Sequence, residues 1–232
     1  MIFTNIMNEI DNRPNYKEIY GFVKDSFEST EHFYHGPFDE TYYTLRVYET
    51  CKEIIKKVNQ KVSIPIVLVA AILHDIGKIK IDSQKLFNTT GRTENSFEEW
   101  KKHAKLGVPI TKETLTKMGH SEQFIEKVCF LIVNHDSRGD KIKNKSIELQ
   151  ILQDADLIAD CGFAGFIRPF LYGSKFNRQI IHTIKYMQNE MNRVGQKDVL
   201  NLDISKKIAG RKIELEKKLI QEISKDIKSD LI

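Results

Sequence analysis

Two adjacent residues, His74 and Asp75, place an imidazole beside a carboxylate at the end of the most apolar segment of the chain. A charge buried there without a partner would cost several kcal/mol unless a cation relieved it. Adjacent helical residues point about 100° apart, yet at a helix end both can converge on one ion beyond the terminus. Gly77 lets the chain turn away, and Lys78 is placed to meet an anionic substrate. For the bare pair alone, a structural role is the stronger interpretation: His74 caps the helix and Asp75 pairs with a lysine.

Three later segments each add one metal-binding side chain to an otherwise apolar helical face. These side chains are His103, His135 and Asp156. Taken singly, each is more often a satisfied core histidine or a surface carboxylate. Together with His74 and Asp75 they form a mixed imidazole and carboxylate set, which suits Mn²⁺, Fe²⁺, Co²⁺, Ni²⁺ or Zn²⁺ and suits Ca²⁺ poorly.

Four segments carry a family resemblance: AAILHDIGK, HAKLG, IVNHD and LQDADLIADCGFAGFIR, in the order His-Asp, His, His, Asp. They resemble the HD-domain metal-dependent phosphohydrolases over residues 40–172. The last segment is similar to a small bacterial and archaeal branch with a DAD-x-x-x-D-x-G-x-x-G run, which includes nucleotide pyrophosphohydrolases.

The resemblance implies an all-α fold with ions in a cleft between helices and with His74, Asp75 and Asp156 as ligands. Members with the extra histidines often hold two metals; Asp75 would then bridge them, and His103 and His135 would serve the second. One or two transition-metal ions are therefore expected, with Mg²⁺ as a further candidate. The implied reaction is hydrolysis of a phosphate ester or anhydride of a small nucleotide-like substrate by a metal-activated water, with Asp75 and Lys78 as the catalytic pair.

One position departs from the family pattern. Members place a first histidine three residues before an Arg-Val pair, and Tyr43 stands there in this chain, in the segment YTLRV. A neutral phenol is a poor ligand for these ions, so we expect the first metal position to be under-coordinated or completed by water. His35, and less readily His32, is the candidate replacement ligand from the preceding loop, although His35 equally resembles an ordinary turn residue.

Phosphoryl chemistry also needs cations beside the ion. The candidate substrate-binding cations are Lys78, Arg138, Arg168 and Lys175, while Arg46 is expected to pair with a carboxylate. Each is individually more often a solvated surface charge, because the chain holds 36 lysines and arginines.

Two further carboxylates neighbour the expected ligands. Asp136 beside His135 and Asp154 near Asp156 are candidates to orient a ligand histidine or accept a proton. The opposite assignment fits the sequence equally well, with Asp154 as the metal ligand and Asp156 as the carboxylate beside it. The sequence leaves these two alternatives open.

The elements that position these side chains are expected to be helices, because apolar residues recur at three- and four-residue steps and strand-like alternation is nearly absent. The predicted helices cover residues 41–59, a buried segment 66–73 capped by Ser63, a helix from Ser96 through His103 that kinks or restarts near Pro109, a helix capped by Ser121, residues 147–159 and residues 203–232. Residues 82–95 and 136–146 are predicted loops.

The predicted fold class is therefore all-α, an HD-type helical bundle with a C-terminal helical extension. Residues 1–39 are expected to form an N-terminal helical segment and loop, 40–176 the metal-binding core, and 177–232 the extension of the same domain. The extension carries a seam of isoleucines, Ile213, Ile220, Ile223 and Ile227, that packs on the body or on a second subunit. A homodimer is thus an open alternative.

Composition narrows the class of protein. With 232 residues, of which 41% are hydrophobic, the chain can bury one good-sized core. The net charge of +4 comes from lysines spread along the sequence, which favours a solvated surface over a nucleic-acid interface. Cys51, Cys129 and Cys161 are odd in number and far apart, so we expect reduced thiols in a cytoplasmic protein.

No apolar run approaches the ~20 residues that cross a bilayer, so we expect neither membrane insertion nor export.

The sequence is consistent with two classes of function. The first class is a phosphohydrolase. The alternative is a catalytically weak module of the same fold that binds a nucleotide or a protein partner.

Overall fold

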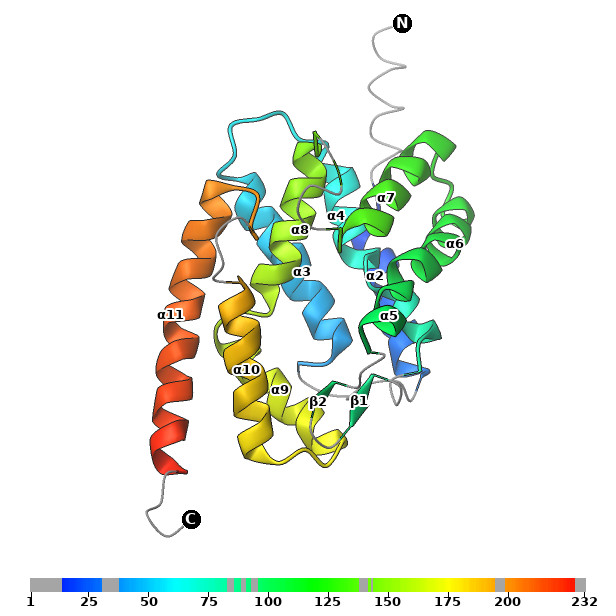
Figure 1. Cartoon of the computed structure of the whole chain (residues 1–232). Coiled ribbons are helices and arrows are strands. Elements are labelled where there is room, and N and C mark those ends of the chain that lie inside the picture. Colours follow the sequence, from blue (N-terminus) through cyan, green and yellow to red (C-terminus); the bar gives the residue numbers. More distant parts are fainter. Residues whose placement is uncertain are drawn as a thin grey trace, which may run out of the picture.

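The computed structural model of the chain is a bundle of α-helices (Figure 1). The structure describes residues 14–30, 38–82, 86–88, 91–92, 96–137, 142, 144–194 and 199–227. The elements are α2 (Tyr16–Glu28), α3 (Glu40–Ile55), α4 (Ile64–Leu73), the 3₁₀ turn η1 (Ile76–Lys80), β1 (Phe87–Asn88), β2 (Gly91–Arg92), α5 (Ser96–Trp100), α6 (Lys102–Lys117), α7 (Glu122–Asn134), α8 (Ile147–Ala159), α9 (Phe163–Lys175), α10 (Ile180–Val194) and α11 (Asp203–Asp226). The all-α prediction is confirmed; the only strands among the described residues are the short antiparallel pair β1 and β2, inside a predicted loop.

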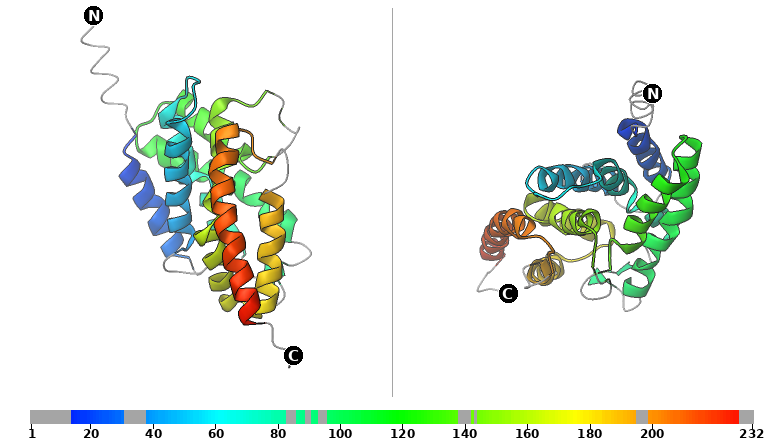
Figure 2. Two further views of the ribbon diagram at one scale, coloured as in Figure 1. Left: turned by 90° about the vertical axis from the view of Figure 1, so that its left-hand side faces the viewer. Right: turned by 90° about the horizontal axis from the view of Figure 1, so that it is seen from above.

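Three helices, α3, α4 and α8, form the centre of the bundle. Residues 67–73 of α4 are all buried, as expected for a helix that is apolar on every side. The apolar face of α3 packs against both α4 and α8. Helices α6 and α7 cover one side of this centre, and α9, α10 and α11 lie on the other side (Figure 2). The helix ends that carry the expected ligands are therefore brought together inside the bundle.

Serines precede α4, α7 and α8, and two of the three cap their helix. Ser121 accepts a hydrogen bond from the Phe124 N–H, and Ser146 accepts one from the Leu149 N–H, so α7 and α8 begin where predicted. Ser63 precedes α4, but its hydroxyl makes no capping bond. The prediction of a Ser63 side-chain cap is therefore wrong.

The helix predicted from Ser96 through His103 is two helices. The helix is interrupted at Lys101, between α5 and α6. The Trp100 carbonyl at this interruption accepts a hydrogen bond from the His103 ring. Pro109 lies inside α6, which continues past it without a restart. The break therefore comes earlier than expected, where a side chain takes a carbonyl that a continuous helix would use.

Gly77 explains how closely η1 and α6 approach. A Cβ atom at Gly77 would lie 2.0 Å from the carbonyl oxygen of His103 and 2.5 Å from the backbone nitrogen of Gly107. Only glycine fits here, because it has no side chain. The close approach sets His103 beside Asp75, a role different from the chain reversal expected of Gly77.

The C-terminal extension packs on the body of the molecule. Helix α11 contacts α8 and α9, with Ile213 in the main core and Ile220 against Ile184 and Met187 of α10. Ile223 and Ile227 are partly buried against the same cluster. The isoleucine seam is thus used within the chain, while the homodimer and the domain boundaries stay predictions.

Two expectations drawn from composition can be compared with the structure. The three cysteines are free and buried. None of the described helices combines the length and apolar character needed to cross a bilayer.

Candidate metal centre

Three histidines share one hydrogen-bonding pattern. In each, the ring Nδ1 bonds the backbone carbonyl three residues earlier: His74 to Ala71, His103 to Trp100 and His135 to Ile132. A carbonyl oxygen can only accept, so Nδ1 carries the proton. In the neutral ring, Nε2 is then left with a lone pair, and the backbone bond fixes the ring orientation.

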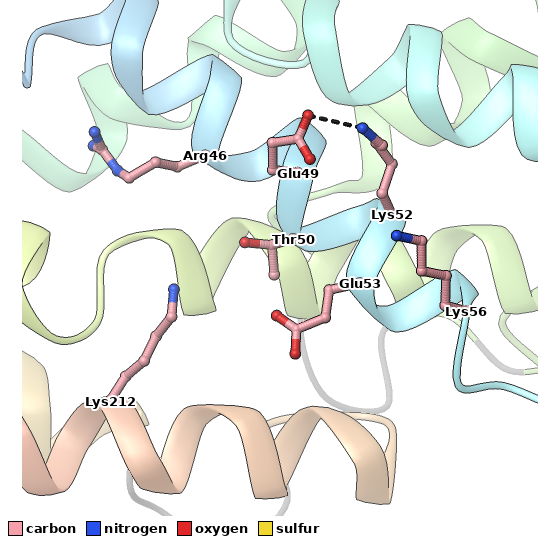
Figure 3. Close-up of a pocket in the computed structure, with 7 residues that line it drawn as sticks. All are labelled: Arg46, Glu49, Thr50, Lys52, Glu53, Lys56 and Lys212. Atoms are coloured by element: carbon pink, nitrogen blue, oxygen red, sulfur yellow. Dashed lines mark hydrogen bonds and ion pairs between the residues drawn. The ribbon is translucent and has the colours of Figure 1, made fainter.

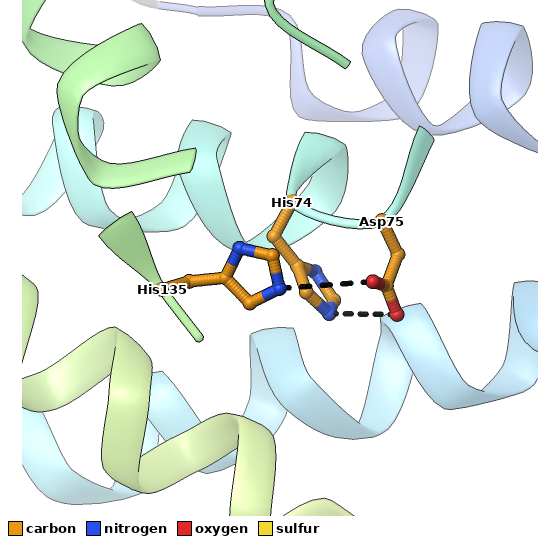
Figure 4. A group of neighbouring side chains, drawn as sticks. All are labelled: His74, Asp75 and His135. Atoms are coloured by element: carbon orange, nitrogen blue, oxygen red, sulfur yellow. Dashed lines mark ion pairs between the residues drawn. The ribbon is translucent and has the colours of Figure 1, made fainter. Parts of the chain in front are cut away.

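The three rings come from helix ends that meet in one place. His74 and His135 are the C-terminal caps of α4 and α7, and His103 lies in the first turn of α6. All three are buried. Figure 4 shows the rings of His74 and His135 pointing toward the Asp75 carboxylate.

Asp75 lies at the centre of the group. Its Oδ2 is 3.1 Å from His74 Nε2, and its Oδ1 is 3.2 Å from His103 Nε2 and 3.8 Å from His135 Nε2. The two oxygens of this buried carboxylate therefore face different histidines. The structure therefore brings together four of the ligands predicted from the sequence: His74, Asp75, His103 and His135.

Asp156 and Tyr43 close one side of the cluster. Asp156 Oδ1 is 3.4 Å from His74 Nε2, so the fifth expected ligand also joins the group. The Tyr43 hydroxyl is 2.6 Å from the same Oδ1 and 2.8 Å from the Asp156 carbonyl oxygen. Tyr43 therefore occupies the place that the resemblance gives to a histidine, but offers a proton where a histidine would offer a lone pair.

Asp136 lies on the open side. Its Oδ2 is 3.4 Å from His103 Nε2 and 3.8 Å from His135 Nε2, and those two nitrogens are 3.1 Å apart. The Asp136 side chain is 35% exposed, whereas the side chain of Asp75 is 4% exposed. Solvent therefore reaches the cluster past Asp136.

Lys78 is enclosed, which differs from the expectation that it faces a substrate. Its ammonium lies 2.6 Å from Asp75 Oδ2 and 3.0 Å from Glu40 Oε2, and 4.4 Å from the centre of the Trp100 ring. The physical reason is that η1 turns back into the bundle, so that the lysine neutralises two buried carboxylates. The sequence reading missed Glu40, although its place one turn before Tyr43 on the same helical face was a usable signal.

Arg168 is likewise buried within the protein. Its Nη1 is 2.7 Å from Asp160 Oδ1 and its Nη2 is 3.2 Å from Glu40 Oε1, an oxygen that also accepts from the Tyr172 hydroxyl at 2.9 Å. The expected substrate contact is thus replaced by an internal network. Lys175 is exposed at the end of α9.

Asp154 does not join the cluster, although it is only two residues from Asp156. Its Oδ1 accepts from the backbone N–H and the side-chain amide of Asn201, both at 2.8 Å, and its Oδ2 accepts from the Leu202 N–H at 2.9 Å. Residues two apart on a helix point about 200° apart, so these two carboxylates face opposite sides of α8. We call Gln153, Asp154, Asn201 and Leu202 the anchor, because they tie the start of α11 to α8.

Arg46 is the remaining described candidate, and it bonds outside the cluster. Arg46 Nε donates to the Ala159 carbonyl oxygen at 3.2 Å, in place of the expected carboxylate. His32, His35 and Arg138 lie outside the described residues.

The carboxylates favour positive charge at two of the imidazoles. Burial by itself lowers the pKa of His74, but Asp75 and Asp156 outweigh it and raise the pKa to about 10. The pKa of His103 is also raised, since Asp75 and Asp136 outweigh burial. Burial lowers the pKa of His135, which favours the neutral ring that binds metals. His74 and Lys78 hold the pKa of Asp75 well below its usual value against the effect of burial.

The donors fit a divalent metal ion. His103 and His135 both use Nδ1 as a donor, so in the neutral rings the two Nε2 lone pairs face each other at 3.1 Å, and either a proton on His103 or a shared metal ion would relieve this contact. His74 Nε2 is also buried without a hydrogen bond. Two groups could hold an ion, His74 with Asp75 and His135, and His103 with His135 and Asp136. Imidazole and carboxylate donors together suit first-row transition metals.

A shallow groove of about 380 Å³ lies elsewhere, between α3 and α11 (Figure 3). The residues that line it are charged or polar in type and include none of the cluster: Arg46, Glu49, Thr50, Lys52, Glu53, Lys56 and Lys212. The chemistry of the cluster, and not this groove, therefore marks the candidate site.

Solved structures share the fold over nearly the whole chain. A predicted HD superfamily hydrolase from an uncultured Thermotogales bacterium aligns with a TM-score of 0.60 at 20% identity, covering 96% of this chain and 99% of the other. Bacillus subtilis YpgQ in complex with ADP aligns with a TM-score of 0.57 at 18% identity, covering 93% and 99%. The Lin1889 protein from Listeria innocua aligns with a TM-score of 0.57 at 21% identity, covering 92% and 98%.

The sequence gives a family assignment that agrees with this fold. No curated protein matches the chain. The family model of the HD domain matches residues 42–159, a span that runs from α3 to the end of α8 and contains every residue of the cluster. On this match and on the His-Asp pair at the end of α4, the chain belongs to the HD-domain family.

Proposed function

We propose that the chain is a metal-dependent phosphohydrolase that cleaves a phosphate ester or anhydride of a small nucleotide-like substrate. The observation that carries this proposal is the shared orientation of three buried histidines, each with Nδ1 on a backbone carbonyl and Nε2 turned toward Asp75 or Asp136. Membership of a family of metal-dependent domains supports the same reading.

The chain's own residues would hold and surround the ion. His74, Asp75, His103, His135 and Asp156 are the proposed ligands, with Asp136 at the exposed edge. When bound, a divalent ion supplies a Lewis acid that activates water and neutralises charge on phosphoryl oxygens. Lys78 forms an ion pair with Asp75 and fixes the position of its carboxylate, and Glu40 forms a second ion pair that fixes Lys78. Both are positioning residues here, because neither ammonium nor carboxylate is exposed to an incoming substrate.

A nucleotide is the proposed substrate class. YpgQ, which shares the fold, was crystallised with ADP. The exposed edge at Asp136 leaves room for a phosphate group to approach the cluster without entering the core. The products of such a hydrolysis would be a nucleotide or nucleoside and either phosphate or pyrophosphate.

The test is a turnover screen on the full chain. Nucleoside mono-, di- and triphosphates and a chromogenic phosphodiester would be incubated with Mn²⁺, Co²⁺ or Ni²⁺, and released phosphate or pyrophosphate measured. We expect turnover of at least one nucleotide that requires the metal and is lost in Asp75→Ala. Glu113→Gln, an exposed carboxylate on α6, is the matched control and should keep full activity. Equal turnover in Asp75→Ala would assign the activity to a contaminant.

A binding module is the second candidate, and Tyr43 is the observation that favours it. A phenol at a ligand position is what a descendant that has lost catalysis would carry. Thermal stabilisation by a nucleotide, with no turnover for any metal, would select this candidate over the hydrolase.

A further inference from the structure

The cluster divides into two halves that share Asp75. We name His74, Asp156 and Tyr43 the inner half, and His103, His135 and Asp136 the outer half. We propose that a single divalent ion binds in the outer half, on Asp75, His103, His135 and Asp136, and that Tyr43 together with Lys78 closes the inner half to metal. This inference rests on the metal dependence proposed above.

The outer half has the dimensions of a four-donor site. From His103 Nε2, the distances are 3.1 Å to His135 Nε2, 3.2 Å to Asp75 Oδ1 and 3.4 Å to Asp136 Oδ2. His135 Nε2 lies 3.8 Å from each of the same two carboxylate oxygens. Donors around a tetrahedral Zn²⁺ with bonds near 2.0 Å stand about 3.3 Å apart. Little movement would therefore be needed to hold an ion.

The outer half also gathers groups that a cation would satisfy. Both imidazoles donate Nδ1–H to a carbonyl, so neither Nε2 has a proton to offer the other in the neutral state. Two carboxylates flank them, and the described ammonium of Lys78 lies on the other oxygen of Asp75. An ion in this half would satisfy two lone pairs and two negative charges at once.

In the inner half, the two carboxylate oxygens that face His74 each lie against a proton donor or a cation of the protein. The Tyr43 hydroxyl lies 2.6 Å from Asp156 Oδ1, the oxygen that faces His74. The Lys78 ammonium lies 2.6 Å from Asp75 Oδ2, the other oxygen that faces His74. A metal ion on either oxygen would have to displace a proton donor, and next to Lys78 it would also meet a positive charge in a medium of low dielectric constant. His74 Nε2 is buried without a hydrogen bond, but the group in which it could hold an ion takes its other two members, Asp75 and His135, from the ligands of the outer half.

The two halves also differ in access. The Asp136 side chain is 35% exposed and the Asp156 side chain 11%, so a substrate reaches the outer half first. An ion there that takes five or six ligands would keep a position for water or substrate beyond the four protein donors, as catalytic metal sites need. The assignment of Asp136 as a ligand also goes beyond the orienting role that the sequence suggested.

The experiment counts ions per chain. The full chain and its variants would be loaded with Mn²⁺ or Zn²⁺ and desalted, the metal measured by mass spectrometry, and Kd measured by calorimetry. We expect one ion in the parent chain, one in His74→Gln and Asp156→Asn, and none in His103→Gln and His135→Gln. Asp136→Asn should raise Kd by at least about tenfold.

Tyr43 supplies the sharpest arm of the test. Tyr43→His should raise the content to two ions, because it replaces a proton donor with a lone-pair donor, whereas the matched control Tyr43→Phe should stay at one. Two ions in the parent chain, or loss of the ion in His74→Gln with retention in His103→Gln, would overturn the inference. So would a single ion in Tyr43→His.

A crystallographic measurement covers variants that fail to fold. Anomalous scattering from crystals of the parent chain grown with manganese should show one peak beside His103 and His135, and a peak between His74 and Asp156 would contradict the assignment.

Failure of the proposed function would give a different result from either peak position: no ion in any variant and no turnover. Turnover with an ion in the inner half would leave the hydrolase standing and remove this inference alone.

Discussion

Asp154 and Asp156 lie two residues apart on α8, both are buried, and their surroundings differ completely. In the anchor, Asp154 receives two backbone N–H groups and one side-chain amide, so its charge is spread over fixed donors. In the cluster, Asp156 faces His74 and accepts from the Tyr43 hydroxyl. A buried carboxylate whose oxygens accept hydrogen bonds from backbone N–H groups has a structural role, whereas one that faces an imidazole lone pair is a candidate metal ligand.

The first way to sharpen this comparison is metal removal, which should have the largest effect. A chelator should lower the Tm of the parent chain, by the equivalent of about 4 kcal/mol when the free ion had been at a thousand times its Kd. The anchor holds no ion, so Asp154→Asn should show the same loss on chelation, while His135→Gln should show none. A chelation effect that vanished in Asp154→Asn would mean that the two regions are not distinct.

Gly77→Ala tests whether the cluster depends on the approach of η1 to α6. The added methyl would overlap the His103 carbonyl and the Gly107 nitrogen, so α6 must move and carry His103 away from Asp75. We expect a loss of about 3 kcal/mol in the free energy of unfolding, with weaker metal binding. Gly21→Ala in α2 is the matched control, because nothing lies within 4 Å of the added atom and a helical alanine is favoured. Urea unfolding measures both; equal stabilities for the two variants would remove the role given to Gly77.

Asp154→Asn tests the anchor itself. The amide can keep one acceptor oxygen but loses the charge that strengthens three hydrogen bonds, so we expect a loss of about 2 kcal/mol in stability. Metal content and Kd should stay at the parent values. A changed Kd with unchanged stability would reverse the assignment of Asp154 and Asp156.

Much of this arrangement follows from local sequence, and the rest does not. The bounds of α8 were predicted because its apolar residues repeat with helical spacing. The five proposed ligands were singled out as a set, because imidazoles and carboxylates on several otherwise apolar helical faces, in the order that the family resemblance gives, indicate a shared ion more strongly than any one of them alone. The partners of Asp154 are Asn201 and Leu202, 47 and 48 residues away, and no local pattern links them. The enclosure of Lys78 by Glu40 was hidden for the same reason, since 38 residues separate the pair.

Glu216 is a third buried carboxylate, and replacing it should have the smallest effect on stability, one that depends on pH. It accepts the Gly162 N–H at 2.9 Å, and burial raises its pKa from 4.5 to about 7. Because the folded chain holds this proton more tightly than the unfolded chain, the stabilising contribution is complete below pH 4.5 and is lost as the pH rises through 7. Glu216→Gln keeps an acceptor without the titration. Its Tm should match the parent near pH 4.5 and exceed it by a few degrees at pH 8, and a constant difference across this range would contradict the assignment.

The carbonyl bonds that fix the three imidazole rings bear on which ion the protein would carry. Rings that stay in place after an ion departs let a different ion enter without refolding, so exchange would be fast compared with unfolding. A set of nitrogen and oxygen donors accepts several first-row ions, so the ion that is bound in a cell depends strongly on which metals are available. The ion found in the purified protein would then report the growth medium and the supply inside the cell, and activity should be restored by several metals added in turn.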